Sequence, residues 1–278
     1  MRHNIRACEG LRASPWESYF PSGPQQHGVA APQPGWAILL GVILAAGKGE
    51  RFKPITYRVP KVLIEVREGL TLLDLAIRTL RTAGLEELVV VAGYRSREVE
   101  KALSGLEGVE VVRNPEYWRE NGISLLRARE AVGSEDFIMV MADHVFEPGL
   151  VELAMRSGPL GLCVDREGRY LLDPGEATKV AIGPGGLIRA LGKGLEAWDA
   201  YDTGVFACNE LMFWAAEELA LRSFRVSVSD CVNFLVSRGV EFKALDATGM
   251  AWADVDTPEV LKFVREELLE LILPKLRA

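Results

Sequence analysis

From Ala37 onward the chain alternates short apolar runs with longer segments whose apolar residues recur at helical spacing. The runs have the length of strands buried within a sheet, and the longer segments have the period of amphipathic helices. The expected strands are 37–45, 62–66, 87–92, 109–112 and 137–142. The expected crossover helices are 71–83, 96–104 and 123–131. This alternation predicts an α/β domain with a mostly parallel central sheet and helices on both faces.

The pattern changes after a helix that is predicted to run from Pro148 to about residue 156. Short apolar runs broken by turn signals, such as Asp173-Pro174-Gly175, then predict a small antiparallel insertion across about 160–208. A last helix is predicted to start at Thr257-Pro258, because threonine caps helices well and proline suits the first helical position. Between the insertion and that helix, the expected elements are helices 209–221 and 227–238 and strands 241–245 and 250–253.

Residues 1–36 are rich in proline, glycine and polar side chains and contain every glutamine of the chain. We interpret them as a flexible N-terminal extension, which leaves 37–278 as the main domain. The longest apolar run, 36–46, is interrupted by Gly41 and is shorter than the roughly 20 residues of a membrane-spanning helix. It is therefore predicted to be a buried strand, and the N-terminus lacks the apolar segment of a signal peptide.

The formal net charge is −7, which argues against a protein that coats nucleic acid or an anionic membrane through bulk charge. The cysteines show neither CxxC spacing nor the density of a disulfide scaffold, so a reduced, cytoplasmic setting without a zinc site is expected. The four are Cys8, Cys163, Cys208 and Cys231.

Against this acidic background, residues 44–61 carry a local excess of positive charge directly after an apolar run. Gly47 and Gly49 allow backbone N–H groups to approach phosphate oxygens closely. The segment therefore predicts a loop that binds an anion of several charges, with a merely solvated basic loop as the alternative. Its five basic residues, which stand against only Glu50, are Lys48, Arg51, Lys53, Arg58 and Lys61.

Two better-known glycine loops do not fit this segment. A P-loop needs GxxxxGK followed by Ser or Thr, and that string does not occur. A dinucleotide-binding fingerprint needs a small residue where Phe52 stands and a helix that starts within the motif. Pro54 and Pro60 instead predict that the loop is extended.

Aspartates follow two of the predicted strands. Asp143 comes after the run 137–141, and Asp254 and Asp256 come after 250–253. Ligands of open α/β sheets bind beyond the carboxyl ends of the strands, and Mg²⁺ takes one or two carboxylates together with phosphate oxygens and water. We therefore predict Mg²⁺ on Asp143 and Asp254, with Asp256 as the alternative ligand; each aspartate alone also suits a turn or helix cap.

These features resemble the nucleotidylyltransferases, which couple a nucleoside triphosphate to a phosphorylated sugar or alcohol. Their signature loop is matched by Leu44, Ala46, Gly47, Gly49, Arg51 and Pro60-Lys61. Residues 91–94 resemble the second nucleotide-facing loop of that superfamily, and 121–125 resemble the segment that closes over the base. The resemblance implies a Rossmann-like nucleotidyltransferase fold whose antiparallel insertion binds the acceptor. The nucleotide contacts that it implies are Leu44, Ala45, Ala46, Gly47, Lys48, Gly49, Gly93, Asn121 and Ser124.

Within that superfamily the chain is most similar to the CTP:inositol-1-phosphate cytidylyltransferases. Four segments, 141–144, 176–180, 201–204 and 252–258, carry this resemblance, which with the loop covers nearly all of 40–270. It implies transfer of CMP from CTP to inositol 1-phosphate, giving CDP-inositol and pyrophosphate, a step of di-myo-inositol phosphate biosynthesis.

The resemblance also implies roles for individual side chains. Arg51 and Lys61 would neutralise the β- and γ-phosphates, and Lys179 would hold the acceptor phosphate. Asp202 would contact inositol hydroxyls, with a turn role before Gly204 as the alternative. The acceptor phosphate needs no general base at neutral pH, because its second pKa is about 6. We therefore assign His144 a structural role.

Two features depart from the family pattern. Residues 1–36 have no counterpart there, and many members are fused to a membrane-embedded CDP-alcohol transferase that is not found before this chain stops. The expected partners are CTP and a phosphorylated polyol, without nucleic acid, and fusion to or association with such a transferase is an open alternative. The oligomeric state is also open.

Other functions are compatible with the same residues. Cytidylyl or uridylyl transfer to phosphocholine, a hexose 1-phosphate or a molybdopterin would use the same chemistry, and Trp198, Tyr201 and Trp252 could form an aromatic cage around choline. A GT-A-type glycosyltransferase would use Asp254-Val255-Asp256 as its metal-binding motif, but would leave Arg51 and Lys61 without a role. A non-catalytic nucleotide-binding relative is the third alternative.

Overall fold

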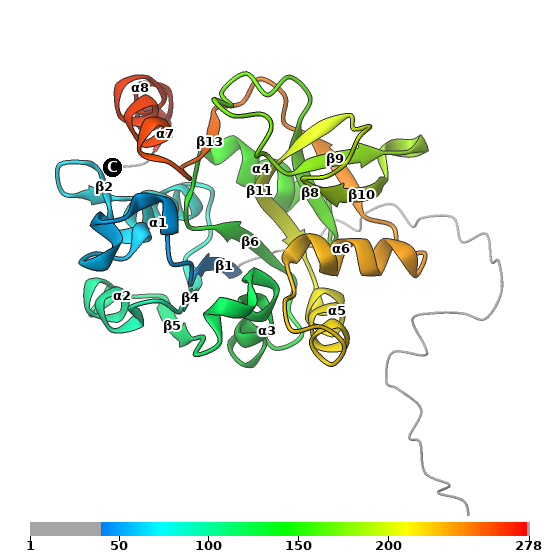
Figure 1. Cartoon of the computed structure of the whole chain (residues 1–278), viewed down its shortest axis with the longest axis horizontal. Coiled ribbons are helices and arrows are strands. Elements are labelled where there is room, and N and C mark those ends of the chain that lie inside the picture. Colours follow the sequence, from blue (N-terminus) through cyan, green and yellow to red (C-terminus); the bar gives the residue numbers. More distant parts are fainter. Residues whose placement is uncertain (1–39, 277–278) are drawn as a thin grey trace, which may run out of the picture. The chain divides into compact units, whose positions relative to one another are not determined.

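A computed structural model describes residues 40–276 of the chain (Figure 1). The predicted N-terminal extension, 1–36, lies outside the described residues, as do the first three residues of the expected strand 37–45. Within the described part of the chain, no helix is long and apolar enough to cross a membrane.

The centre of the fold is a sheet to which nine strands of the described residues belong, with a main path in the order β10-β9-β11-β6-β1-β4-β5. The four strands of its parallel part are β1 (Leu40–Ala45), β4 (Glu87–Ala92), β5 (Val109–Arg113) and β6 (Phe137–Met141). Residues 42–45 of β1 are at most 6% exposed, because parallel strands are covered on both faces. The mostly parallel sheet predicted from the sequence is confirmed.

The predicted antiparallel insertion does not form a separate sheet; it extends the main one. β11 runs antiparallel to β6 and also pairs with β8 and β9, while β12 pairs in parallel with β8. These strands are β8 (Gly161–Asp165), β9 (Lys179–Ile182), β10 (Ile188–Gly192), β11 (Ala200–Cys208) and β12 (Lys243–Asp246).

Helices cover both faces of the sheet, as the alternating pattern predicts. On one face α1, α2 and α4 pack against side chains of β1, β4 and β6, and the contacts of α3, α5 and α6 with one another form a second helical layer. The helices are α1 (Leu72–Thr82), α2 (Ser96–Leu103), α3 (Asn121–Val132), α4 (Pro148–Arg156), α5 (Glu210–Ala220), α6 (Val228–Ser237), α7 (Pro258–Phe263) and α8 (Leu269–Ile272), the last two joined through a π-helical segment (Val264–Leu268).

The predicted strand 62–66 is wrong. Lys61–Leu63 form a 3₁₀ helix, and β2 (Glu65–Arg67) pairs only with β3 (Leu70–Thr71) in a small hairpin. Val62, Ile64 and Val66 are all buried at alternate positions, which is the pattern of a strand, but they are distributed between two separate parts of the core. Alternate burial therefore does not require an extended backbone here.

The glycine loop is not extended either. Two further 3₁₀ helices, Glu50–Phe52 and Ile55–Tyr57, follow Gly49, and their backbone hydrogen bonds turn the chain back towards the sheet. The two prolines only precede such turns, because proline supplies a backbone torsion that helical turns accept at their start.

The strand order places the predicted site residues at one edge of the sheet. β1 lies between β4 and β6. From β1 the chain passes to β4 and β5 on one side and then crosses to β6 on the other side, so the gap between β4 and β6 at the end of β1 is a topological switch point. The carbonyl of Leu44 accepts a hydrogen bond from the N–H of Ala142, and that of Ala46 accepts one from Tyr94. The start of the glycine loop is therefore held from both neighbouring strands.

A second small sheet lies beside this edge. β7 (His144–Phe146) pairs antiparallel with β13 (Trp252–Asp254), with Asp254 opposite His144. Trp252 is 1% exposed, and its indole N–H donates to the carboxylate of Asp165, which is fully buried, at 2.9 Å. This contact fixes β13 to β8 of the main sheet.

We predict that Trp252→Phe destabilises the fold, because it leaves the buried Asp165 oxygen without a donor. The expected cost is about 1–3 kcal/mol of unfolding free energy, measured as a lower midpoint in urea. The control is Trp198→Phe, because Trp198 is 41% exposed and the expected cost of its substitution is under about 0.5 kcal/mol. Equal urea midpoints for the two variants would contradict the claim that the hydrogen bond from the Trp252 indole to Asp165 stabilises the fold.

Candidate functional site

The geometry of the glycine loop depends on Gly49. Its φ of +60° lies in the left-handed region, and a Cβ there would come within 2.7 Å of the Lys61 Cβ. A Cβ on Gly47 would meet nothing within 4 Å, so this part of the loop is open to an approaching ligand. The turn after Gly49 buries Phe52 and leaves Arg51 exposed.

Lys61 is the buried cation of the site. Its side chain is 6% exposed, and Nζ donates to Asp143 Oδ2 at 2.8 Å and to Asp256 Oδ1 at 2.6 Å. Burial alone would lower the pKa of this ammonium, but the surrounding carboxylates of Asp143, Asp256 and Asp254 raise it above its ordinary value. Lys61 therefore keeps its positive charge at neutral pH.

Arg51 joins the same network from the surface. Its guanidinium donates to Asp256 Oδ2 at 2.9 Å and to Glu176 Oε2 at 3.0 Å. Asp256 therefore bridges the two cations of the glycine loop, one through each oxygen. Glu176 belongs to the segment between β8 and β9, so the insertion also contacts the glycine loop through this ion pair.

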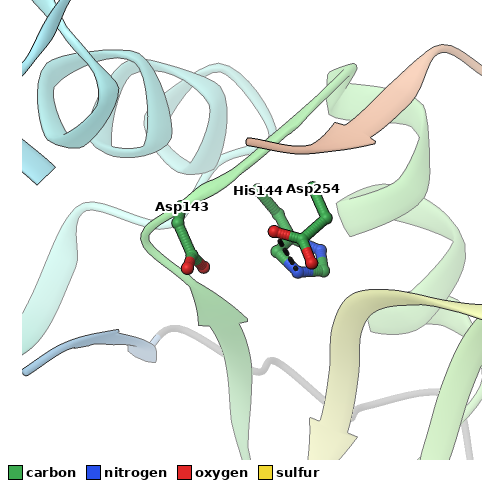
Figure 2. Close-up of side chains that lie close together, drawn as sticks. All are labelled: Asp143, His144 and Asp254. Carbon is green, nitrogen blue, oxygen red and sulfur yellow. Dashed lines mark ion pairs between the residues drawn. The ribbon is translucent and has the colours of Figure 1, made fainter. Parts of the chain in front are cut away.

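Asp143, His144 and Asp254 form a cluster (Figure 2). Asp143 also joins it to Lys61 through the hydrogen bond from that ammonium. Asp143 lies just beyond the end of β6, and the imidazole Nε2 of His144 is 3.6 Å from Asp254 Oδ1 across the β7–β13 pair. Burial would raise the pKa of Asp143, but the ammonium of Lys61 together with His144 lowers it to about 2. Burial raises the pKa of Asp254 to about 6, with His144 opposing and the carboxylate of Asp143 reinforcing the shift.

The residues present fit a divalent cation. One ligand atom from each of Asp143, His144 and Asp254 can be chosen so that all three lie within 4.8 Å of one another. Asp254 Oδ1 is buried without a hydrogen-bond partner, and such an atom is costly unless something binds it. The three carboxylates of Asp143, Asp254 and Asp256 still outnumber the two cations beside them, Lys61 and Arg51, so a further positive charge would balance the cluster.

Two adjoining cavities open around Asp254 and Asp256. The first, of about 180 Å³, is lined by Asp143, His144, Asp202, Thr178 and Asn121 among others. The second, of about 290 Å³, lies between residues 170–177 and the start of α7 and includes Arg51 and Glu176. Predicted metal and acceptor residues therefore meet in the first cavity, and the surface cation of the loop lines the second.

The structure brings together most of the predicted catalytic residues, but not all. Lys61, Asp143 and Asp254 converge, and Asp202 lies in the same cavity, where burial raises the pKa of its carboxyl to about 6 although the Gly204 N–H donates to it. Lys179 begins β9 with Nζ 4.5 Å from the ring centroid of Trp198, and it lines neither cavity.

The predicted nucleotide contacts differ in what they offer a ligand. Leu44, Ala45 and Ala46 are buried, so only their backbone faces the loop. Lys48 is half-exposed and stands 5.8 Å from the ring centroid of Tyr117. A Cβ on Gly93 would lie 2.9 Å from the Ala46 carbonyl oxygen, so close packing against the backbone by itself explains why glycine occupies this position.

The two predicted contacts from α3 have different surroundings. Asn121 lines the first cavity, and its Oδ1 accepts from the N–H of Val228 at 2.8 Å. Ser124 is 2% exposed, and its hydroxyl accepts a hydrogen bond from Asn114. The burial of Ser124 and its hydrogen bond with Asn114 explain a serine at this position without a ligand. Its contact with a nucleotide stays a prediction.

Sequence reasoning missed two features of the site and left one alternative open. It gave Glu176 no role, although the residue stands in one of the quoted segments, and it did not foresee that His144 faces Asp254. The aromatic cage for choline stays a prediction: Trp252 lines the first cavity, whereas Trp198 and Tyr201 line neither cavity. Single-sequence spacing carries no signal for the Glu176 and His144 contacts.

We predict that Lys61→Met lowers the free energy of unfolding by about 2–4 kcal/mol in EDTA, since it leaves unpaired carboxylates in a partly buried cluster. This loss of unfolding free energy is smaller than the loss expected when a fully buried ion pair is broken, because the side chains of Asp143 and Asp256 are each about one-third exposed. Lys53→Met is the matched control, because that lysine is exposed and its partners, Glu50 and the ring of Tyr57, also lie on the surface. Urea titrations of both variants measure the difference, and similar midpoints would refute the role of Lys61.

Comparison with known proteins extends these findings. The MobA-like NTP transferase domain matches residues 41–181. Two relatives named bifunctional IPC transferase and DIPP synthase, from Rubrobacter xylanophilus and Aquifex aeolicus, are 40% and 35% identical over 231 residues. Each alignment covers 82% of this chain and 51% of the relative, so the chain spans about half the length of these proteins.

Solved structures agree with the fold. The inositol-1-phosphate CTP transferase from T. maritima superposes with a TM-score of 0.72 and 25% identity, covering 84% of this chain and 98% of that one. The match of this domain to half of the sequence settles the family, and the glycine loop and Asp143 lie within the matched residues. The chain belongs to the MobA-like NTP transferase domain family.

Proposed function

We propose that the chain transfers CMP from CTP to inositol 1-phosphate and releases CDP-inositol and pyrophosphate. The observation that carries the proposal is the convergence of Arg51 and Lys61 with Asp143 and Asp254 at the edge of the sheet. A triphosphate with its cation needs both signs of charge at one place. The names of the similar proteins, an inositol-1-phosphate CTP transferase and bifunctional IPC transferases, support the choice of substrates.

The reaction needs positioning and charge more than proton transfer. An oxygen of the inositol phosphate bonds to the α-phosphorus of CTP while the bond from that phosphorus to the oxygen bridging to the β-phosphate breaks, and pyrophosphate leaves with the electron pair. The acceptor phosphate is largely dianionic at neutral pH, since its second pKa is about 6. No side chain therefore has to act as a general base.

The two cations of the loop would act on the leaving pyrophosphate. Lys61 is held rigidly by two carboxylates, so it offers a preorganised charge, and such charges act without reorganisation during the reaction. Arg51 is exposed and can exchange its carboxylate partners for phosphate oxygens. Asp256 would then hold the loop cations in place and would not be the primary metal ligand.

A divalent cation, Mg²⁺ in this proposal, would be held by Asp143 and Asp254 and would supply positive charge to the α-phosphate. The acceptor would lie in the 180 Å³ cavity, where Asp202 and Thr178 can accept hydrogen bonds from hydroxyl groups. Lys179 would have to turn from Trp198 to reach an acceptor phosphate there.

The bifunctional names of the relatives also suggest a partner. Because the chain spans about half of their length, we propose that it works with a second activity that consumes CDP-inositol, joined to it or separate. A cytoplasmic location remains part of this proposal, and the three cysteines that the structure describes, Cys163, Cys208 and Cys231, are free and buried.

We predict that purified protein releases pyrophosphate from CTP only when inositol 1-phosphate is added with a divalent cation. The assay crosses four nucleoside triphosphates with inositol 1-phosphate, phosphocholine and hexose 1-phosphates, and a coupled enzyme reports pyrophosphate. Faster turnover with phosphocholine or a hexose phosphate would replace the acceptor assignment, and activity only on a nucleotide-sugar donor would favour glycosyl transfer.

In the same assay, Arg51→Met should lower kcat/KM by roughly 10²–10³-fold, as is typical when one donor to the charge that develops in the transition state is removed. Arg67→Met is the matched control, because Arg67 forms an exposed ion pair with Glu270. Unchanged kcat/KM in the Arg51 variant would remove that residue from the mechanism.

A further inference from the structure

We propose that His144 is a third protein ligand of the divalent cation, through Nε2, so that the site is built from two aspartates and one imidazole. The inference deepens the proposed function, because it concerns the cation that would serve the transfer reaction. It goes beyond the two-carboxylate site expected from the sequence, in which His144 was structural. Its consequence is a preference for Mn²⁺ or Co²⁺ over Mg²⁺.

The hydrogen bond on the other ring nitrogen orients the imidazole. Nδ1 of His144 lies 2.8 Å from the backbone carbonyl of Thr203, and a carbonyl can only accept, so Nδ1 carries the proton. Thr203 is fully buried, and its hydroxyl donates to the Cys163 carbonyl at 2.8 Å. Burial by itself would lower the pKa of His144, but the carboxylates of Asp254 and Asp143 raise it, so a cation that binds here has to displace the Nε2 proton. In the neutral ring that results, Nε2 has the free lone pair, and this atom faces Asp254.

The position of the ring is fixed from two further sides. Gly204 has φ +80°, and a Cβ there would come within 2.3 Å of His144 Nδ1, so the backbone passes directly against the ring. The indole of Trp252 stacks on the imidazole with an interplanar angle of 22° and is itself held by Asp165. Metal-bound histidines are typically held in this way, with the other nitrogen bonded to a carbonyl or carboxylate.

The spacing of the facing atoms fits a shared cation better than a direct hydrogen bond. Nε2 of His144 and Oδ1 of Asp254 are 3.6 Å apart, beyond a good N–H···O distance, and this oxygen has no other hydrogen-bond partner. Two ligands that are each about 2.1 Å from one metal lie about 3–3.4 Å apart for coordination angles of 90–110°. A small movement therefore brings both atoms to a common ion.

The donor set determines which cation binds best. Mg²⁺ prefers oxygen ligands and water, whereas an imidazole increases affinity along the series from Mn²⁺ to Co²⁺. Asp143 completes the set from the end of β6, with one oxygen bonded to Lys61 and the other still able to bind. Mg²⁺ still binds through the two aspartates, but His144 gives it little advantage.

The test is to bind Mn²⁺ to the full chain without nucleotide and to record pulsed electron paramagnetic resonance. A directly bound imidazole gives a ¹⁴N coupling to the manganese electrons. The sample is the double variant His3→Gln/His27→Gln, in which His144 is the single histidine left. We expect the ¹⁴N coupling in this protein and in the wild type.

Adding His144→Gln should abolish the coupling and weaken Mn²⁺ binding by about 10–100-fold, while Mg²⁺ binding changes only a few-fold. Calorimetry measures both affinities. Absence of the coupling in the double variant, or failure of Mn²⁺ to bind, would overturn the inference even if the His144 variant does not fold. Because no substrate is present, these results do not depend on whether CTP and inositol 1-phosphate are the true substrates.

Discussion

The site depends on one interaction, the pairing of the buried Lys61 ammonium with Asp143 and Asp256. An ammonium that is 6% exposed would be very costly without partners, so the fold must bring carboxylates to it. Lys61 ends the glycine loop, Asp143 follows β6, and Asp256 follows β13. One charge therefore connects three distant parts of the chain and holds the loop against the end of the sheet.

The balance of charge around this lysine explains what the site can accept. Asp143, Asp254 and Asp256 outnumber the buried ammonium, and the exposed Arg51 lies at the rim. Such a cluster attracts a divalent cation, while the loop cations attract phosphate groups. A nucleoside triphosphate bound to its metal satisfies both requirements at once, which a free anion or a free cation does not.

The β7–β13 pair gives the site its rigidity. It presents His144 and Asp254 opposite each other, and the buried contact of Trp252 with Asp165 ties it to β8. Metal ligands on paired strands with buried supporting contacts are held more precisely than metal ligands on free loops. The insertion, in contrast, reaches the glycine loop through the exposed pair of Glu176 with Arg51.

The sequence by itself determined the α/β alternation, the glycine loop with its required Gly49, and the aspartates that follow β6 and β13, because burial period and turn chemistry are local properties. Only the tertiary structure decided that Asp256 bridges the two cations, that Glu176 meets Arg51 and that His144 faces Asp254. Lys61 is 82 residues from Asp143 and 195 from Asp256. Contacts over such separations depend on strand order and register, which no local pattern encodes. The buried positions of 62–66 have the local pattern of a strand, and only the tertiary structure shows that they pack into two separate parts of the core.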